Sequence, residues 1–245
     1  MIKVLVNGAH GRMGTHSVNA INDDQDLLLV AQTDIHDDLT QVIKKKKPDV
    51  VLDFTQPASV KENTKKILAE NCRAVIGTTG LKDSDLTEIK KIAYTNKIGI
   101  LVVPNFAIGA VLMMKFATIA AKYMPRVEII EKHHDKKIDA PSGTAIKTAD
   151  LINEANPNIN KQKLEEKELI SKVRGGLKNK IPIHSVRLPG FVAAQEVIFG
   201  GLSQVLTIKH DTLDRESFMP GVVLAIKKVM DINRLVYGLE NILEV

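Results

Sequence analysis

Short apolar runs alternate with amphipathic segments through the N-terminal part of the chain. Each run is hydrophobic along its length and rich in β-branched side chains, which is typical of a strand covered on both faces. The runs lie at residues 2–7, 27–33, 50–54, 74–76 and 99–103. Helical periodicity follows the first glycine turn to about residue 22 and recurs at 59–71 and 84–96. Such strands, separated by amphipathic helices, predict parallel βαβ units and an α/β fold with a Rossmann-type nucleotide domain.

After residue 104 the pattern becomes that of a second kind of domain. An apolar helix is predicted at 108–123, where Met113, Met114 and Phe116 should belong to the core. The other predicted elements are strands at 126–133, 183–187, 195–199 and 204–210, helices at 144–154 and 218–230, and a polar excursion at 156–180. This mixture predicts an α+β domain with a mixed, open sheet, inserted into the nucleotide domain. We therefore expect a dinucleotide-binding domain at 1–104 and 216–245, and a substrate-binding domain at 105–215.

Composition and charge narrow the possible classes of protein. The chain carries 34 Lys and Arg against 29 Asp and Glu, and this net charge of +5 favours anionic ligands. No apolar run approaches the ~20 residues that cross a bilayer, and a single cysteine excludes a disulfide framework. We therefore expect a cytoplasmic protein without a membrane partner. Six Phe, three Tyr and no Trp give few platforms for stacking bases, so we expect no nucleic-acid partner; the lysine run at 44–47 should close a helix.

A glycine-rich segment follows the first predicted strand and opens the first helix. It has the spacing G-x-x-G-x-x-G and begins with Gly8, Ala9, His10, Gly11, Arg12 and Met13. Backbone amides and the helix dipole at such a start can bind a pyrophosphate. Asp34 ends the second strand about 20 residues after Gly14, where a carboxylate can accept hydrogen bonds from an adenosine ribose. The segment predicts a dinucleotide site, and a tight turn beside a surface aspartate is the alternative.

The choice of cofactor turns on Asp34. A carboxylate repels a 2′-phosphate, and Ile35 stands where an arginine could have offset that charge, so the position favours NADH. Arg12 or His36 could still reach a phosphate, so NADH and NADPH both stay open.

Two further loops lie at the carboxyl ends of predicted strands, where open α/β sheets bind ligands. The first contains Gly77, Thr78 and Thr79, and the second contains Val103, Pro104, Asn105 and Phe106. Phe106 could pack against a nicotinamide and Asn105 could bond its amide. Together with the glycine-rich segment, these loops complete the predicted cofactor site.

The segment EKHHDKKIDAPSGTA, residues 131–145, gathers titratable groups ahead of a glycine turn. A metal site would need further ligands in a known spacing, and we expect no metal. A nucleophile at Ser142 would need an elbow or triad that the sequence lacks. An acid–base histidine, His133 or His134, with Lys137 beside a bound anion fits best. A solvated strand end followed by a capped helix is the structural alternative, and in either case the helix start offers amides and hydroxyls to an anion.

That segment resembles the signature of the dihydrodipicolinate reductase family. The segments GAHGRMG, VVLDFTQP, VIGTTGL, PNFAIG and SVRLPG follow the order found in the family and extend the likeness over most of the chain. The resemblance implies reduction of 4-hydroxy-tetrahydrodipicolinate to tetrahydrodipicolinate, in lysine and diaminopimelate biosynthesis, by hydride from NADH or NADPH. It also implies a homotetramer formed through the substrate domain.

Residue roles follow from the same resemblance. His133 would be the proton donor and Lys137 a second donor or an electrostatic partner, while Arg187 is a candidate substrate contact. The small dicarboxylate substrate would be bound by His134, Ser142, Gly143 and Thr144. Gln195 stands where many relatives carry a histidine. Two alternatives stay open: a non-catalytic dinucleotide-binding redox sensor, and a reductase of another small dicarboxylate.

Overall fold

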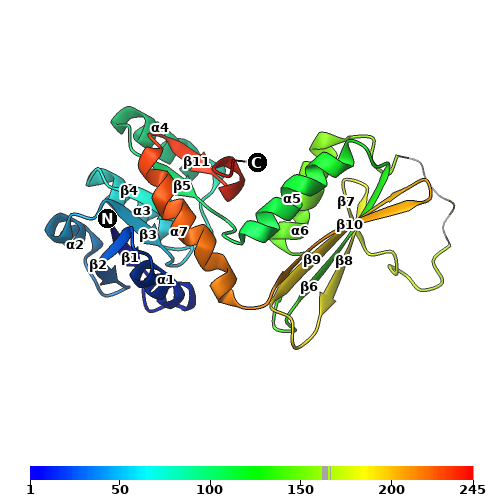
Figure 1. Ribbon diagram of the computed structural model, residues 1–245, viewed down its shortest axis with the longest axis horizontal. Coiled ribbons are helices and arrows are strands. Elements are labelled where there is room, and N and C mark those ends of the chain that lie inside the picture. The colour runs from blue at the N-terminus through cyan, green and yellow to red at the C-terminus, as the bar shows by residue number, and fades with distance from the viewer. Residues whose placement is uncertain (162–164, 166, 245) are drawn as a thin grey trace. The chain divides into compact units, whose positions relative to one another are not determined.

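The computed structural model describes residues 1–161, 165 and 167–244 and divides into two compact units (Figure 1). One unit comprises Met1–Ile108 and Arg215–Val245, and the other comprises Gly109–Asp214. The sequence prediction places its domain boundaries at 104/105 and 215/216. Residues 162–164 and 166 of the predicted polar excursion, and residue 245, lie outside the described part of the chain.

The first unit is built on a parallel sheet of six strands. These are β1 (Ile2–Asn7), β2 (Leu27–Thr33), β3 (Val50–Asp53), β4 (Arg73–Ile76), β5 (Ile100–Val102) and β11 (Leu235–Tyr237). Their order across the sheet is β11-β5-β4-β3-β1-β2, so β1 has β2 on one side and β3 on the other. The strand order therefore reverses at β1, the kind of switch point beside which open α/β sheets bind ligands. This topology confirms the predicted Rossmann-type α/β domain.

Helices cover both faces of that sheet, as Figure 1 shows for the first unit. They are α1 (Arg12–Asp23), α2 (Leu39–Lys46), α3 (Val60–Ala69), α4 (Asp83–Asn96) and α7 (Met219–Lys228), with 3-10 turns η1 (Arg215–Phe218), η2 (Val229–Asp231) and η3 (Leu239–Asn241). Alternate strand residues such as Leu5 and Val51 pack against α2, α3 and α4 in one buried cluster. On the opposite side, α1 packs against α7, where the Ser17 hydroxyl meets the Met219 sulfur. Apolar side chains on both strand faces explain why the runs are continuous.

The second unit contains a mixed sheet and two helices. Its elements are α5 (Ile108–Ala121), β6 (Arg126–His133), α6 (Gly143–Ala155), β7 (Gly176–Lys178), β8 (Ile181–Arg187), β9 (Ala193–Gly201) and β10 (Gln204–Thr212). The strand order is β10-β9-β6-β8-β7, in which β6 pairs antiparallel with β9 and parallel with β8. Helix α6 packs on β6, and Asn156 ties the end of α6 to α5 by donating to the Ala121 carbonyl at 2.8 Å. The central strand, β6, carries the titratable segment.

Three features depart from the sequence prediction. Phe116 is 43% exposed, so its assignment to the core was wrong, whereas Met113 and Met114 are buried. Helix α5 is apolar on most of its surface, and such a helix does not reveal which face is covered. The short strands β7 and β11 were not predicted. Among the described residues, no helix is both long enough and apolar enough to cross a membrane.

Candidate active site

The glycine-rich segment forms a tight connection between β1 and α1. Gly8 has a φ of +82°, and a Cβ there would lie 2.5 Å from the Phe54 carbonyl oxygen. A Cβ on Gly14 would lie 2.1 Å from the Gly8 carbonyl oxygen, so the helix can pack this closely only on glycine. Gly11 is the N-cap of α1 and provides no side-chain cap, which leaves the first amides of the helix available to an anion. These features fit a bound pyrophosphate.

Asp34 lies directly after β2 and turns toward this segment. Its carboxylate accepts hydrogen bonds from the backbone amides of Ile35 at 2.8 Å and His10 at 3.1 Å. The Ile35 amide is the main reason that the pKa of Asp34 lies below its ordinary value, and His10 adds to the effect. Asp34 is thus an ionised acceptor beside the glycine-rich segment, as a ribose contact requires.

A buried carboxylate, Asp53, joins the loops at this edge of the sheet. The side chain of Asp53 is 0% exposed and accepts hydrogen bonds from Thr78 Oγ1 at 2.6 Å, Thr55 Oγ1 at 2.7 Å and Asn7 Nδ2 at 2.8 Å. Asn7 ends β1, Asp53 ends β3 and Thr78 follows β4. One carboxylate therefore fixes three neighbouring loops, a role that the sequence reasoning did not assign.

Aromatic packing fixes the other two predicted loops. The rings of Phe54 and Phe106 are tilted by 60° with centroids 5.4 Å apart. A Cβ on Gly77 would lie 2.1 Å from Phe54 and 2.8 Å from Phe106, so only glycine fits beneath both rings. Phe106 is itself 4% exposed, and Asn105 accepts a hydrogen bond from the Ala107 amide at 2.9 Å.

All the predicted cofactor residues thus follow strands of one parallel sheet. They lie after the carboxyl ends of β1, β2, β4 and β5. Three of these residues are exposed at this edge: Arg12, Thr79 and Pro104. Four others are buried beneath the loops: Ala9, Thr78, Val103 and Phe106. With uncapped amides, an ionised acceptor and glycines where a side chain would clash, this edge fits a dinucleotide.

The titratable segment is organised around Glu131 on β6. Glu131 is fully buried, and its carboxylate contacts His133 Nδ1 at 2.5 Å. Arg187, at the end of β8, donates from Nη2 to Oε1 at 2.8 Å and from Nη1 to Oε2 at 3.0 Å. The backbone amide of Ser142 also donates to Oε1, at 3.3 Å. The strand end and the start of α6 therefore meet at one carboxylate.

The turn after β6 carries the cationic groups. Lys137 Nζ donates to both carboxylate oxygens of Asp139, at 2.7 and 2.8 Å. The Lys137 amide donates to the His134 carbonyl at 3.1 Å, which closes the turn. Arg187 contacts the same turn by donating to the Asp139 carbonyl at 2.8 Å.

The start of α6 provides a second place for an anion. The Ser142 hydroxyl caps the helix by accepting from the Ala145 amide at 3.2 Å, and Ser142 is only 3% exposed. Gly143 is exposed, and a Cβ built there would meet no atom within 4 Å. Gln195 is buried and donates to Thr148 Oγ1 at 2.8 Å, which in turn donates to the Thr144 carbonyl. Buried hydrogen bonds therefore hold the first turn of α6, and Gly143 leaves the start of the helix accessible.

Burial and nearby charges set the titration of His133. Burial is the largest cause and holds the pKa of His133 below its ordinary value, although contact with Glu131 raises it. The positive charges of Lys137 and Arg187 lower this pKa further. An anion bound beside these cations would offset their effect, so ligand binding should make His133 easier to protonate.

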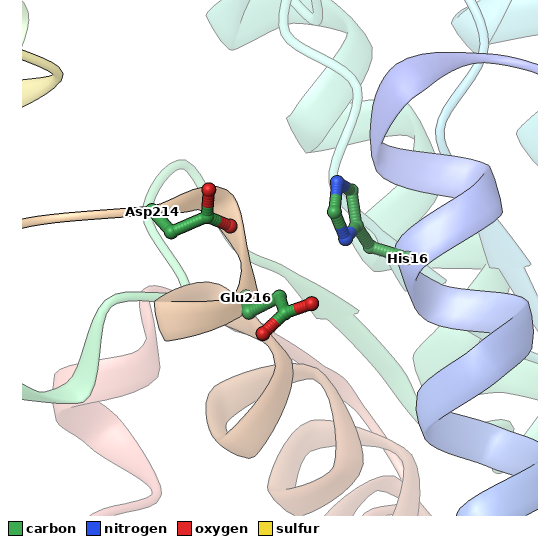
Figure 2. Close-up of side chains that lie close together, drawn as sticks. All are labelled: His16, Asp214 and Glu216. Atoms are coloured by element: carbon green, nitrogen blue, oxygen red, sulfur yellow. The ribbon is translucent and has the colours of Figure 1, made fainter.

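A further group of possible metal ligands lies outside these clusters. Figure 2 shows the side chains of His16, Asp214 and Glu216, whose ligand atoms lie within 4.8 Å of one another. His16 comes from α1, and the two acids flank Arg215, where the chain passes between the two units. Both acids are exposed, and exposed acidic groups commonly gather without a metal.

Comparison with known proteins identifies the family. A model described as "Dihydrodipicolinate reductase, N-terminus" matches residues 2–106, and one described as "Dihydrodipicolinate reductase, C-terminus" matches residues 109–243. The chain belongs to the dihydrodipicolinate reductase family. Curated relatives named 4-hydroxy-tetrahydrodipicolinate reductase include one from Syntrophomonas wolfei, 48% identical over 98% of both chains. Another, from Listeria innocua, is 49% identical over 99% of this chain and 100% of the relative.

Solved structures agree with this assignment. The dihydrodipicolinate reductase from Paenisporosarcina sp. TG-14, described as dipicolinate-bound, superposes with a TM-score of 0.93 at 46% identity, covering 99% of this chain and 100% of that one. GenD2 from gentamicin A biosynthesis, described as a complex with NAD, has a TM-score of 0.62 at 11% identity, over 98% of this chain and 90% of that one. The second likeness shows the fold alone. Members of the family are oxidoreductases, and a nicotinamide dinucleotide is their cofactor.

Three residues of the two clusters were missed or left open by the sequence reasoning. Glu131 and Asp53 received no role, and Arg187 was only a candidate contact. Glu131 had a readable signal, because residues i and i+2 of a strand share a face, so Glu131 and His133 had to point the same way. Arg187 is far away in sequence and meets Glu131 only because β8 pairs with β6.

Proposed function

We propose that this chain reduces 4-hydroxy-tetrahydrodipicolinate to tetrahydrodipicolinate with a reduced nicotinamide dinucleotide, as a step of lysine and diaminopimelate biosynthesis. The observation that carries the proposal is the cluster on β6, in which Glu131 holds His133 and Arg187 while the cationic turn leads to the open start of α6. This cluster lies in a chain that belongs to the dihydrodipicolinate reductase family along its length.

The substrate is a small dicarboxylate, and the second unit offers positive groups to its carboxylates. The amides at Gly143 and Thr144 begin a helix of 13 residues, whose dipole favours a negative charge at this end. His134 and Lys137 supply further donors, and both are partly exposed. Dipicolinate, named for the related solved structure, is a dicarboxylate of the same kind. Ser142 contributes through its position, since its hydroxyl already caps the helix.

The cofactor is held at the carboxyl edge of the parallel sheet. Gly8 to Met13 would hold the pyrophosphate, Asp34 the adenosine ribose, and the loops at 77–79 and 103–106 the nicotinamide end. When bound, the dinucleotide supplies a hydride. We propose that NADH is preferred over NADPH. The ionised carboxylate of Asp34 would repel the 2′-phosphate of NADPH, and position 35 is an isoleucine, where an arginine could have offset that repulsion.

The residues of the chain provide the proton and the electrostatic field. Loss of the 4-hydroxyl group as water leaves a conjugated cyclic imine. Hydride addition to this system builds negative charge on the ring, and His133, in its protonated form, donates a proton that neutralises it. The Lys137 ammonium group lies beside this site and is itself held by Asp139. Burial of His133 makes its protonated form a stronger acid, which favours transfer of the proton to the substrate.

We also propose that the enzyme forms a homotetramer in the cytoplasm. The edge strand β10 exposes apolar side chains, with Val205 72% and Leu206 42% exposed. An uncovered edge strand with apolar side chains is a surface that proteins usually cover. Native mass spectrometry tests the assembly, and a monomer at micromolar concentration would contradict it.

The activity is tested with substrate made in place from pyruvate and aspartate semialdehyde by the preceding synthase. The loss of reduced-nicotinamide absorbance is followed with NADH and NADPH in parallel. We expect rapid oxidation, faster with NADH. A folded protein that binds NADH but oxidises neither cofactor would contradict the proposed reaction and favour a redox sensor or another dicarboxylate.

A further inference from the structure

Glu131 is a buried carboxylate in the middle of a β-sheet. It lies on the central strand of a five-stranded sheet, and its side chain is 0% exposed. His133 follows Glu131 by two positions along the strand, so both side chains leave the same face of β6. His133 is 16% exposed, so it lies between the buried carboxylate and the solvent.

Arg187 keeps this buried carboxylate charged. It lies beside His133 in the parallel register of β6 and β8, and it contacts both oxygens of Glu131. Burial acts to raise the pKa of Glu131, but hydrogen bonds from Arg187, Ser185 and His133 outweigh burial and hold that pKa below its ordinary value. A charged acceptor, held by Arg187, therefore faces Nδ1 of His133 near neutral pH.

We infer that Glu131 is a positioning residue for the acid–base histidine, holding His133 through Nδ1 so that Nε2 is the nitrogen that exchanges a proton with the substrate. The inference rests on the proposed function and names a residue that acts through His133, without touching the substrate. Because one carboxylate also receives the Ser142 amide, Glu131 sets the histidine and the start of α6 at a fixed separation.

The charges that face His133 determine the direction in which its pKa should shift when Glu131 is replaced. Glu131 on the same strand raises the pKa of His133, whereas Lys137 in the following turn and Arg187 on β8 lower it. Asp139 is bound to Lys137, and the register partner on β9 is the uncharged Ala193. Removing the charge of Glu131 must therefore shift the pKa of His133 downward.

The experiment compares Glu131→Gln, Glu131→Asp and the wild-type enzyme. In Glu131→Gln, we expect kcat to fall roughly 10- to 100-fold, while NADH affinity stays unchanged. The decline of kcat/KM with rising pH should move to lower pH by about one unit. Glu131→Asp keeps the charge and should restore most of the original pH profile. An unchanged profile in Glu131→Gln would overturn the inference.

A matched control lies on the same strand. Glu128 also contacts a histidine and an arginine, His184 and Arg174, but it points to the other face of the sheet. Glu128→Gln removes the same charge from β6 and should leave both kcat and the pH profile unchanged. An equal shift in this control would show that the charge of the strand, not the contact to His133, matters.

A second measurement needs no substrate and no substitution at Glu131. Nitrogen NMR of wild-type protein labelled at histidine, with the His133 signals assigned by their loss in His133→Asn, reports which ring nitrogen carries the proton. We expect Nδ1–H in the neutral ring, and Nε2–H would overturn the inference. An inactive wild-type enzyme with the Nδ1–H form would contradict the proposed reaction alone.

Discussion

Replacing Asp53 with asparagine should weaken both the fold and the binding of NADH. Asp53 is fully buried; Oδ1 accepts from Thr78 Oγ1, Thr55 Oγ1 and the Thr55 amide, and Oδ2 accepts from Asn7 and Asn63. An asparagine has the same shape, but its amide group would turn a donor toward groups that are themselves donors. The loops after β1 and β4 would then lose their common anchor.

The expected loss of stability and of NADH affinity in Asp53→Asn follows from these contacts. A hydrogen bond to a charged group contributes ~1.5–3 kcal/mol, and bonds that share one carboxylate do not add in full. We therefore expect Asp53→Asn to lower the free energy of unfolding by about 3–5 kcal/mol. In a chain of this length that corresponds to a fall in Tm of about 10 °C. We expect the Kd for NADH to rise about tenfold, since a loss of ~1.4 kcal/mol in binding has that effect.

The assay and its control both use features of this chain. Because the chain has no Trp, Tm is followed by circular dichroism, and Kd is measured by titration calorimetry. The matched control is Asp49→Asn, just ahead of the opposite end of β3, where the carboxylate accepts from the Lys3 amide at 2.7 Å in an exposed contact. The control should change little. If Asp53→Asn kept the wild-type Tm and Kd, Asp53 would not anchor the cofactor edge.

Three further predictions concern the remaining clusters. His133→Ala and Lys137→Ala should each lower kcat by ~10²-fold or more with NADH affinity unchanged, and full activity in either variant would refute the assigned role. Asp34→Ala should weaken NADH more than NADPH in parallel titrations; the reverse order would exclude the ribose contact. In the folded protein the pKa of Glu131 lies below its ordinary value. Its contribution to stability is therefore complete above about pH 4.3, the pKa of an unperturbed Glu, and is lost as the pH falls through the pKa in the folded protein. Below about pH 4.5, calorimetry should show a smaller fall of Tm with decreasing pH in Glu131→Gln than in the wild-type protein. Equal slopes of Tm against pH in the two proteins would contradict this.

The sequence by itself determined the nucleotide domain almost completely. Continuous apolar runs flanked by helical periodicity placed β1 and β2 at their observed bounds, and the glycine spacing placed the first βα turn. These features are local: the covered strand must be apolar throughout, and the turn must lack side chains where atoms approach within 3 Å. The lysine run likewise proved to be the last turn of α2, as its position before Pro48 had indicated.

Only the tertiary structure decided the elements and contacts that depend on a distant partner. The strand β11 has three residues, too few for a periodic signal, and it is a strand because the edge of β5 offers it hydrogen-bonding groups. Phe116 lies on a helix that is apolar on most sides, so the packing alone decided that it would be exposed. In the same way, the sequence supplied His133 and the Asp53 carboxylate, but the sheets brought Arg187 and Thr78 to them. Strand pairing is set by contacts between remote segments, and no local pattern records which strands become neighbours.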